Sequence, residues 1–441
     1  MATFGIFTLG CKVNQYESEA IAELLEARGL VQLHGEEICD LYIINTCTVT
    51  GESDRKARQM IRRAVSQNPS AYVLVTGCLA ETDVESIKKI DGVDYICGNA
   101  DKSKIADAAL ELLKKGSKNS KTLCEITDIN SAPFEPMSIT KFDRTRAYIK
   151  IEDGCESHCT YCIIPKARGK IRSKPFDDVI AEVKKLTAGG CREIVLTGIE
   201  TGSYGRDIGS SLAELLEAVD KIEGVGRIRL GSLDPSIMKK DFIERISKLK
   251  SLAHHFHISM QSGSNSVLRN MKRKYNAEMA LSSIEELRNA MPDVSFTTDI
   301  IVGFPGETEE NFNETLEFAK KAKFLMMHVF PYSKRAGTPA AAMEDQLDKA
   351  TKKQRVSLLS QCGTEIRQAI LEEAVANTKT AQVLFENLKD GYAYGHTDNF
   401  LEVRVKSECS LHSQLLNVRF VALNKGIIEA ELMPPERIKL K

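Results

Sequence analysis

The 441-residue chain lacks a long apolar run and an excess of charge of one sign. No stretch approaches about 18 uninterrupted apolar residues, and the N-terminal residues do not show a basic segment followed by a long apolar core. We therefore expect a cytoplasmic protein with no membrane partner. Lysine and arginine number 60 and aspartate and glutamate 61. This balance gives no global indication of a nucleic-acid partner, but it is compatible with a local basic groove.

The twelve cysteines do not read as a disulfide framework, which is typical of small secreted domains. Six of them are scattered through apolar or ordinary surroundings, and we expect them to be buried as small hydrophobic residues. These six are Cys39, Cys97, Cys124, Cys191, Cys362 and Cys409. The other six fall into two groups of three.

One group lies in a single short segment, Cys155-Glu-Ser-His-Cys159-Thr-Tyr-Cys162, and no fourth cysteine lies close by. A structural zinc site normally has four ligands, more often in Cys-x-x-Cys pairs. Three thiolates can instead hold three corners of a [4Fe–4S] cube and leave the fourth iron open. An open iron can bind a small molecule and pass it an electron, so this spacing indicates chemistry rather than scaffolding.

The second group is spread over the first hundred residues. The segments FGIFTLG, DLYIINT and AYVLVTG are apolar and β-rich, and they alternate with the helical patterns ESEAIAELLEARG and ESDRKARQMIRRAV. This alternation predicts a doubly wound parallel sheet. Cys11, Cys47 and Cys78 follow its first three predicted strands. Because the carboxyl ends of parallel strands lie along one edge, we expect these cysteines to converge in one crevice.

The remaining pattern predicts an α/β protein with two further domains. We expect a first domain over residues 1–115, a linker over 116–143, a (β/α)6 partial barrel with a closing helix over 144–372, and a small antiparallel β-barrel over 373–441. The small barrel has the size used to grip RNA, and a structural or dimerising role is the alternative. Cys155, Cys159 and Cys162 fall on the loop after the first strand of the partial barrel, where catalytic residues gather.

Polar and flexible residues recur at the strand ends of the partial barrel. Together they would suit a ligand with amino-acid, ribose and adenine parts, although Gly-Phe-Pro-Gly is also an ordinary turn. The candidate ligand-binding residues are Tyr161, Gly198, Glu200, Ser232, Gln261, Asp299, Gly303, Phe330 and Tyr332.

The motif Cys155-x3-Cys159-x2-Cys162, with Tyr161 before the third cysteine, resembles that of the radical S-adenosylmethionine (SAM) enzymes. TLGCKVNQYESE, NTCTVT, TGCLA and CTYCIIPKARGK further resemble the methylthiotransferases over essentially the whole chain. KVNQYESE and NTCTVT are most similar to the branch that acts on threonylcarbamoyladenosine beside the tRNA anticodon. The resemblance implies an N-terminal three-cysteine domain, a radical SAM barrel and a C-terminal TRAM domain.

The resemblance also implies the chemistry. A cluster on Cys155, Cys159 and Cys162 would bind SAM and cleave it to a 5′-deoxyadenosyl radical, a step that needs a cofactor. A second [4Fe–4S] cluster, on Cys11, Cys47 and Cys78, would donate the methylthio group to adenine carbon C2, with SAM also the methyl donor. The implied partners are the tRNA anticodon stem-loop, a one-electron reductant such as flavodoxin or ferredoxin, and a sulfur source.

Several basic residues are candidates for RNA binding. In the C-terminal barrel these are Arg404, Lys406 and Arg419, and on the helix after Cys47 they are Arg55, Lys56, Arg58, Arg62 and Arg63. Lys166 and Arg168 would either neutralise charge of the cluster or SAM, or lie on the surface. The alternative functions are a non-catalytic RNA-binding iron–sulfur sensor, and a methylthiotransferase for another tRNA base or a ribosomal protein side chain.

Overall fold

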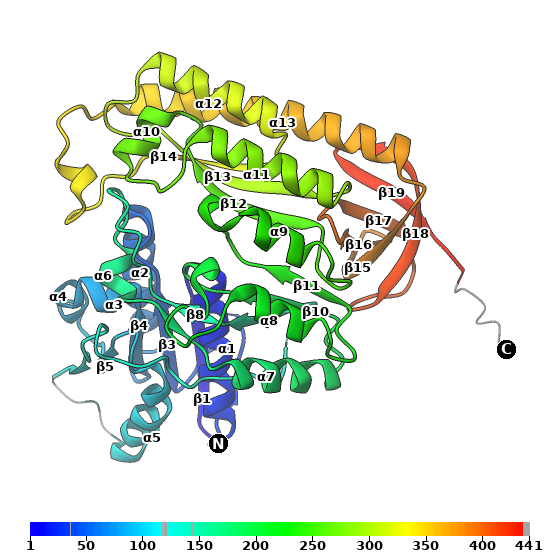
Figure 1. The fold of residues 1–441 in the computed structure, drawn as a ribbon. Coiled ribbons are helices and arrows are strands. Elements are labelled where there is room, and N and C mark those ends of the chain that lie inside the picture. The colour runs from blue at the N-terminus through cyan, green and yellow to red at the C-terminus, as the bar shows by residue number, and fades with distance from the viewer. Residues whose placement is uncertain (36, 117, 119–120, 143, 435–441) are drawn as a thin grey trace.

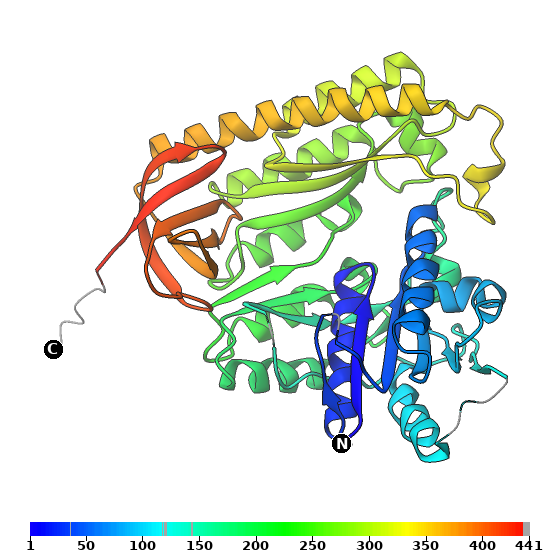
Figure 2. The same cartoon turned by 180° about the vertical axis from the view of Figure 1, so that it is seen from behind.

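The computed structural model describes residues 1–35, 37–116, 118, 121–142 and 144–434. Parts of the predicted linker (117, 119, 120 and 143) and the end of the predicted C-terminal domain (435–441) lie outside the described residues. Figures 1 and 2 show an N-terminal part in blue and cyan and a small C-terminal barrel in red. These two parts lie on different sides of a central green part.

The N-terminal part is a six-stranded, fully parallel sheet in the order β2-β1-β3-β4-β5-β6. Helices α1 and α5 pack into one buried apolar cluster, whereas α2, α3 and α4 pack into another. The predicted doubly wound sheet is confirmed. Its strands are β1 (Thr3–Thr8), β2 (Val31–Gln32), β3 (Leu41–Thr46), β4 (Tyr72–Gly77), β5 (Tyr95–Cys97) and β6 (Leu123–Glu125). Its helices are α1 (Lys12–Glu26), α2 (Gly51–Gln67), α3 (Cys78–Thr82), α4 (Val84–Lys88), η1 (Lys102–Lys104) and α5 (Ile105–Lys115).

The predicted linker contributes to this sheet, because β6 lies within it and pairs with β5. Further along the same segment, Met137 and Ile139 are buried in the main core. The described part of 116–143 is therefore packed structure and not a free connection.

The central part contains all six strands predicted for the partial barrel. They form two parallel sheets, β11-β10-β7 and β12-β13-β14, and the isolated parallel bridges Ile228↔Leu252 and Leu233↔Ile258 connect the β11 region to β12 and the segment before it. The strands are β7 (Ala147–Lys150), β10 (Glu193–Thr197), β11 (Arg227–Leu230), β12 (His255–Gln261), β13 (Ser295–Val302) and β14 (Met326–Pro331). The main helices are α7 (Phe176–Ala188), α8 (Leu212–Val219), α9 (Lys240–Ile246), α11 (Ala277–Ala290) and α12 (Glu309–Ala322).

Short elements line the ends of these strands and carry much of the site described below. They are β8 (Glu152–Asp153), β9 (Arg172–Ser173), α6 (Ile164–Arg168), α10 (Asn265–Asn270), η2 (Thr201–Ser203), η3 (Pro235–Ile237) and η4 (Pro339–Ala342).

The 29-residue helix α13 (Lys349–Asn377) leads from the central part to the closed barrel β15-β16-β17-β19-β18 (Figure 1). The barrel was predicted as antiparallel, but β17 and β19 pair in parallel. The reason is that the β18–β19 hairpin places β19 between β18 and β17. The strands are β15 (Thr380–Lys389), β16 (Tyr392–Thr397), β17 (Glu402–Lys406), β18 (Leu415–Asn424) and β19 (Ile427–Leu432).

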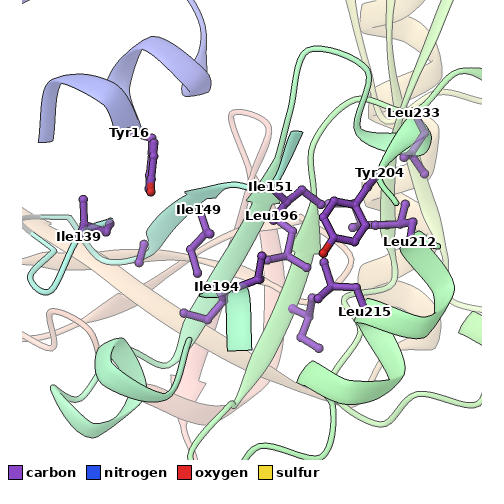
Figure 3. Packing of buried hydrophobic residues seen from close by; sticks show 14 of the residues in the cluster. Tyr16, Ile139, Ile149, Ile151, Ile194, Leu196, Tyr204, Leu212, Leu215 and Leu233 are labelled. Carbon is purple, nitrogen blue, oxygen red and sulfur yellow. The ribbon is translucent and has the colours of Figure 1, made fainter. Parts of the chain in front are cut away.

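The N-terminal and central parts share one hydrophobic core. Tyr16 of α1 belongs to the same buried cluster as Ile149 of β7, Ile194 of β10 and Leu215 of α8. Figure 3 shows Tyr16 below the blue helix, Ile149 and Ile194 at the strands, and Leu215 beside a green helix on their other side. Burial of this continuous apolar surface holds the two parts in a fixed relation.

Four of the six scattered cysteines are buried as predicted: Cys39, Cys97, Cys191 and Cys362. The expectation was wrong for Cys124 and Cys409, which are exposed. Cys124 lies in the short edge strand β6 and Cys409 in the connection between β17 and β18, and neither segment is covered.

No helix among the described residues is long and apolar enough to cross a membrane.

Candidate active site: two three-cysteine sites

Cys11, Cys47 and Cys78 lie at the carboxyl ends of three neighbouring strands. Cys11 caps the N-terminus of α1 after β1, Cys47 directly follows β3, and Cys78 begins α3 after β4. The strand order reverses between β1 and β3, since the chain passes from β1 outward to β2 and then returns to β3. Ligands bind at such a switch point in open α/β sheets.

Two glycines bring the three cysteine loops into contact. Gly10 has a φ of +110°, and a Cβ there would lie 3.0 Å from the Cys47 Sγ. Gly77 has a φ of +95°, and a Cβ there would lie 2.4 Å from the carbonyl oxygen of Thr46. Only glycine suits both the conformation and the space. The residues before Cys11 and Cys78 therefore pack directly against the chain around Cys47.

Arg168, at the end of α6, completes this first site from the central part. Its Nε donates to the Cys78 Sγ at 3.3 Å, and its Nη atoms donate to Glu17 at 2.5 Å and Asn14 at 2.6 Å. The side chain is fully buried. Of the two uses left open for Lys166 and Arg168, Arg168 thus lies against a cysteine, but against one of the other group. Lys166 is exposed.

The surroundings of Arg168 are a buried network of charges. Glu17 pairs with Arg168, Lys150 and Lys102, and Arg168 and Lys150 also reach Asp153 at 3.3 Å. Burial would raise the pKa of Glu17, but the three cations outweigh it and hold that pKa well below its usual value. Arg172 also reaches Asp153, at 3.5 Å. Four cations thus surround Glu17 and Asp153, and Arg168 among them places its positive charge directly at the Cys78 sulfur, where it would favour a thiolate or another negatively charged group.

The second group lies on the loop between β8 and α6. The Thr160 backbone N–H donates to Met271 at 3.1 Å, and its Oγ1 donates to the Asn270 carbonyl oxygen at 2.8 Å. On the other side, the Ala340 N–H donates to the Thr160 carbonyl oxygen at 2.8 Å. The loop is therefore held between the α10 region and η4.

Each cysteine of this loop has a polar neighbour at its sulfur. The backbone N–H of Ser157 donates to the Cys155 Sγ and that of Ile164 to the Cys162 Sγ, both at 3.4 Å. Arg273 donates to the Cys159 Sγ at 3.1 Å and pairs with Asp234 at 2.6 Å. The sequence analysis did not find Arg273. It stands in a run of basic residues, Lys272-Arg273-Lys274, which by itself indicates only a solvated face.

Glu200 was predicted as a ligand-binding residue and lies against the first cysteine of the loop. The Cys155 thiol donates to its carboxylate at 3.2 Å, and the Ser157 hydroxyl donates to it at 3.3 Å. Burial, followed by the charge of Glu200, raises the pKa of Cys155. Burial likewise raises the pKa of Cys162 to about 11. Both thiols hold their protons at neutral pH, and iron binding would displace those protons.

These arrangements fit cubane clusters better than single metal ions. All six cysteines are free thiols. In the part of the chain that the structure describes, no three His, Cys, Asp or Glu side chains converge closely enough to share one ion. In a [4Fe–4S] cube each thiolate binds its own iron, so the ligands need not meet at one point, and hydrogen bonds to the sulfurs tune the cluster.

Other predicted ligand residues lie around the second site. Tyr161 and Tyr332 pack in one apolar cluster with Phe304, and the buried Tyr332 hydroxyl has no hydrogen-bond partner among the described residues. Gly303 has a φ of +70°. A Cβ at Gly198 would lie 2.5 Å from a Glu152 carboxylate oxygen, so the β10 loop passes closely over that side chain.

The other predicted residues are more open. Gln261 has a φ of +65° at a shift in the β12–β13 register, a conformation rare outside glycine and characteristic of strained sites. A carboxylate oxygen of Asp299 lies 3.3 Å from the His257 Nε2. Phe330 is 47% exposed and Ser232 is exposed. None of these is paired with a cysteine in the described structure.

The predicted RNA-binding residues differ in how far they are already paired. On α2, Arg55 pairs with Glu52, whereas Lys56 and Arg62 are exposed. Arg58 is half-buried and Arg63 exposed. In the C-terminal barrel, Arg404 pairs with Glu429 and Arg419 with Glu431. Lys406 is exposed and has no ion-pair partner among the described residues.

Comparison with known proteins agrees with this geometry. Residues 149–319 match the radical SAM superfamily, and residues 3–98 match the uncharacterized protein family UPF0004. The chain is 42% identical to the threonylcarbamoyladenosine tRNA methylthiotransferase MtaB of Bacillus subtilis, covering 96% of this chain and 94% of that protein. It is 40% identical to the MtaB protein of Thermotoga maritima, covering 83% of each.

A second kind of relative is the tRNA-2-methylthio-N(6)-dimethylallyladenosine synthase of Acetivibrio thermocellus, 35% identical over 97% of this chain and 90% of that protein. The chain therefore belongs to the radical SAM methylthiotransferases. Among solved structures, the radical SAM methyltransferase TsrM of Kitasatospora setae superposes with a TM-score of 0.57 at 15% identity, covering 77% of each chain. That similarity concerns the fold alone.

Proposed function

We propose that this chain transfers a methylthio group to ring carbon C2 of N6-threonylcarbamoyladenosine beside the tRNA anticodon. The observation that carries the proposal is the pairing of two three-cysteine sites through Arg168. This residue follows the Cys155–Cys162 loop in the chain and donates to Cys78 of the other site. The two relatives reported above at 42% and 40% identity are named for the same base.

When bound, the two [4Fe–4S] clusters and SAM supply the electron, the radical and the methylthio group. Cys155, Cys159 and Cys162 hold the cluster that opens SAM, and Cys11, Cys47 and Cys78 hold the cluster that donates sulfur. The protein divides activation from delivery by placing the two cysteine sets on different parts of the fold.

The surrounding residues bind and orient. Arg168 and Arg273 donate hydrogen bonds to cysteine sulfurs of the first and second site. Glu200, whose carboxylate lies at the Cys155 sulfur, would accept a hydrogen bond from an ammonium or hydroxyl group of SAM. The other residues proposed to line the SAM site are Tyr161, Gly198, Ser232, Gln261, Asp299, Gly303, Phe330 and Tyr332.

The proposed partners follow from this reaction. We assign the anticodon stem-loop of tRNA to α2 and the C-terminal barrel, and we assign the electron to a reductant such as flavodoxin or ferredoxin. A sulfur source must restore the first cluster after each turnover. The division into 1–115, 116–143, 144–372 and 373–441, with a TRAM domain at the end, and the cytoplasmic location belong to the same proposal.

The test uses anaerobically reconstituted full-length protein. It should carry about eight irons if both sites hold cubane clusters. With SAM and a reductant it should convert threonylcarbamoyladenosine in tRNA to the 2-methylthio form, detected by mass spectrometry of digested nucleosides. The matched substrate is tRNA with dimethylallyladenosine, which should react poorly. Modification of that base instead, or of a ribosomal protein, would contradict the substrate assignment, and about four irons would contradict the second cluster.

A further inference from the structure

Lys12 is the first residue of α1 and directly follows Cys11. Figures 1 and 2 both show the end of β1 and the start of α1 directed toward the central sheets. Lys12 is exposed, and within the described residues its ammonium has no hydrogen-bond or ion-pair partner. It is therefore an uncommitted cation beside a cysteine of the sulfur-donating site.

The surroundings of Lys12 belong to the inner side of the partial barrel. Its charge interacts with Arg146, Arg229 and Glu193, which stand at the start of the first sheet of the central part. Lys12 therefore lies close enough to these groups of the central part for their charges to act on it.

The cations near Lys12 already have ion-pair partners. Arg146 pairs with Glu193 at 2.7 Å and with Glu386. Arg229 pairs with Glu193 at 3.0 Å and donates to the Asp398 carbonyl oxygen at 3.2 Å.

Arg227 likewise pairs with Glu193 at 3.1 Å and donates a hydrogen bond to the His396 carbonyl oxygen at 3.3 Å. Burial holds the pKa of His255 well below its usual value, so that ring is neutral at pH 7. The three arginines thus share the carboxylates of Glu193 and Glu386, and the charge of Asp398 also acts on Arg227. Among the described cations of this group, Lys12 has no ion-pair partner and can bind an incoming anion.

The proposed substrate carries such an anion. In adenine, C2 and C6 flank N1, so the N6 substituent projects from the same edge as the carbon that is modified. The threonylcarbamoyl substituent ends in a free carboxylate, whereas a dimethylallyl substituent is apolar. With C2 turned toward the sulfur-donating site, the substituent would also project toward the edge of the sheet that carries Cys11 and Lys12.

Resting on the proposed function, we propose that the Lys12 ammonium binds the threonyl carboxylate and so selects the carboxylated adenosine over adenosines with apolar N6 groups. A hydrogen bond between two charged groups is among the stronger polar contacts. It also discriminates between substrates, because an apolar substituent offers the ammonium no such partner.

The test compares two forms of one anticodon stem-loop, with the threonyl carboxylate free or converted to its methyl ester. Equilibrium binding is measured by fluorescence anisotropy, and KM and kcat on reconstituted enzyme. Lys12→Met should weaken binding and raise KM for the free acid by about 10- to 100-fold, the factor for a hydrogen bond to a charged group. It should change the ester little, and Lys12→Arg should restore much of the preference.

Lys56→Met on α2 is the matched control, because it removes a lysine of the predicted RNA surface and should affect acid and ester alike. An equal loss on acid and ester in Lys12→Met would make Lys12 a general RNA contact and overturn the proposal, as would no loss at all. Loss of iron from Lys12→Met would instead make it a residue that supports the cluster, which also overturns the proposal. If wild-type enzyme does not modify the free-acid substrate, the proposed function itself fails.

Discussion

Both three-cysteine sites contain an arginine that donates a hydrogen bond to a cysteine sulfur, but the two arginines come from different places in the fold. In each, an arginine donates to one cysteine sulfur, Arg168 to Cys78 and Arg273 to Cys159. Arg273 belongs to the same part of the fold as its cysteine and is balanced by Asp234. Arg168 instead reaches from the central part into the N-terminal sheet, and its balancing carboxylates, Glu17 and Asp153, come one from each part.

This difference shows that the first three-cysteine site is not a property of the N-terminal part alone. A second contact supports this conclusion, because Arg335, after β14, pairs with Asp54 and donates to Thr48, the residue after Cys47. The shared core around Tyr16 adds a third. The central part therefore completes the first site and also fixes its position relative to the second.

The largest expected effect separates the roles of the two sites. Cys155→Ser should abolish SAM cleavage, because the cluster that opens SAM loses a ligand. Cys47→Ser should leave cleavage to 5′-deoxyadenosine and stop methylthio transfer. Each variant should retain about four irons, half of the amount for two cubane clusters. Chromatography of 5′-deoxyadenosine and mass spectrometry of the modified nucleoside check both outcomes. Continued transfer by Cys47→Ser would erase the functional difference between the sites.

A smaller effect should separate the two arginines. Arg168→Met leaves Glu17 and Asp153 buried with less positive charge, so it should cost about 3–5 kcal/mol of unfolding free energy and selectively deplete iron in the first site. Arg273→Met removes a less buried donor and should cost about 1–3 kcal/mol. Urea unfolding and iron analysis measure both. Arg192→Met, at an exposed position, is the control and should stay within about 0.5 kcal/mol of wild type. If Arg168→Met and Arg273→Met lost the same unfolding free energy, the proposed difference between the two sites would be contradicted.

The third comparison concerns the pH dependence of stability, which should have opposite signs at the two sites. The folded pKa of Glu17 is lowered, so its stabilisation is complete above the unfolded value of about 4.3 and is lost as pH falls below it. Burial, with the charges of Asp153 and Glu200, raises the pKa of Glu152 well above normal. Its burial therefore costs stability as pH rises above about 4.3.

Melting temperatures between about pH 3 and 8 should show both slopes. Glu17→Gln should flatten the acid limb and lower stability at pH 7 by about 3 kcal/mol. Glu152→Gln should reduce the loss of stability as pH rises. At pH 7 the variant should be within about 1 kcal/mol of wild type in unfolding free energy, or more stable than wild type. Slopes of the same sign in the two variants would contradict the assignment of the two carboxylates.

Much of the fold could be predicted because its signals are local. Each predicted strand of the two parallel series is a short apolar run between helical patterns, and each cysteine of the first site directly follows such a run. Strands β2, β5 and β6 were not predicted, because each has only two or three residues and so shows no period. The parallel β17–β19 pair was missed because strand order within a barrel depends on distant pairing.

The partners of the charged residues could not be predicted from such local signals. Arg168 follows the cysteine loop in sequence, which suggested a role at that loop or on the surface, yet it binds a cysteine 90 positions away. Arg273 lies 114 positions from Cys159. No periodicity or spacing encodes such contacts. They arise because the carboxyl ends of two sheets meet at one interface.

The sequence by itself determined the two cysteine sets, their places at strand ends and the kind of cofactor they suit, because thiol spacing and hydrophobic period are read over a few residues. The tertiary structure alone decided which charges complete each site and leave Lys12 without an ion-pair partner in the described part of the chain. Burial makes an unmatched charge costly, so the balance between Arg168, Glu17 and Asp153 exists only once the N-terminal and central parts have packed together.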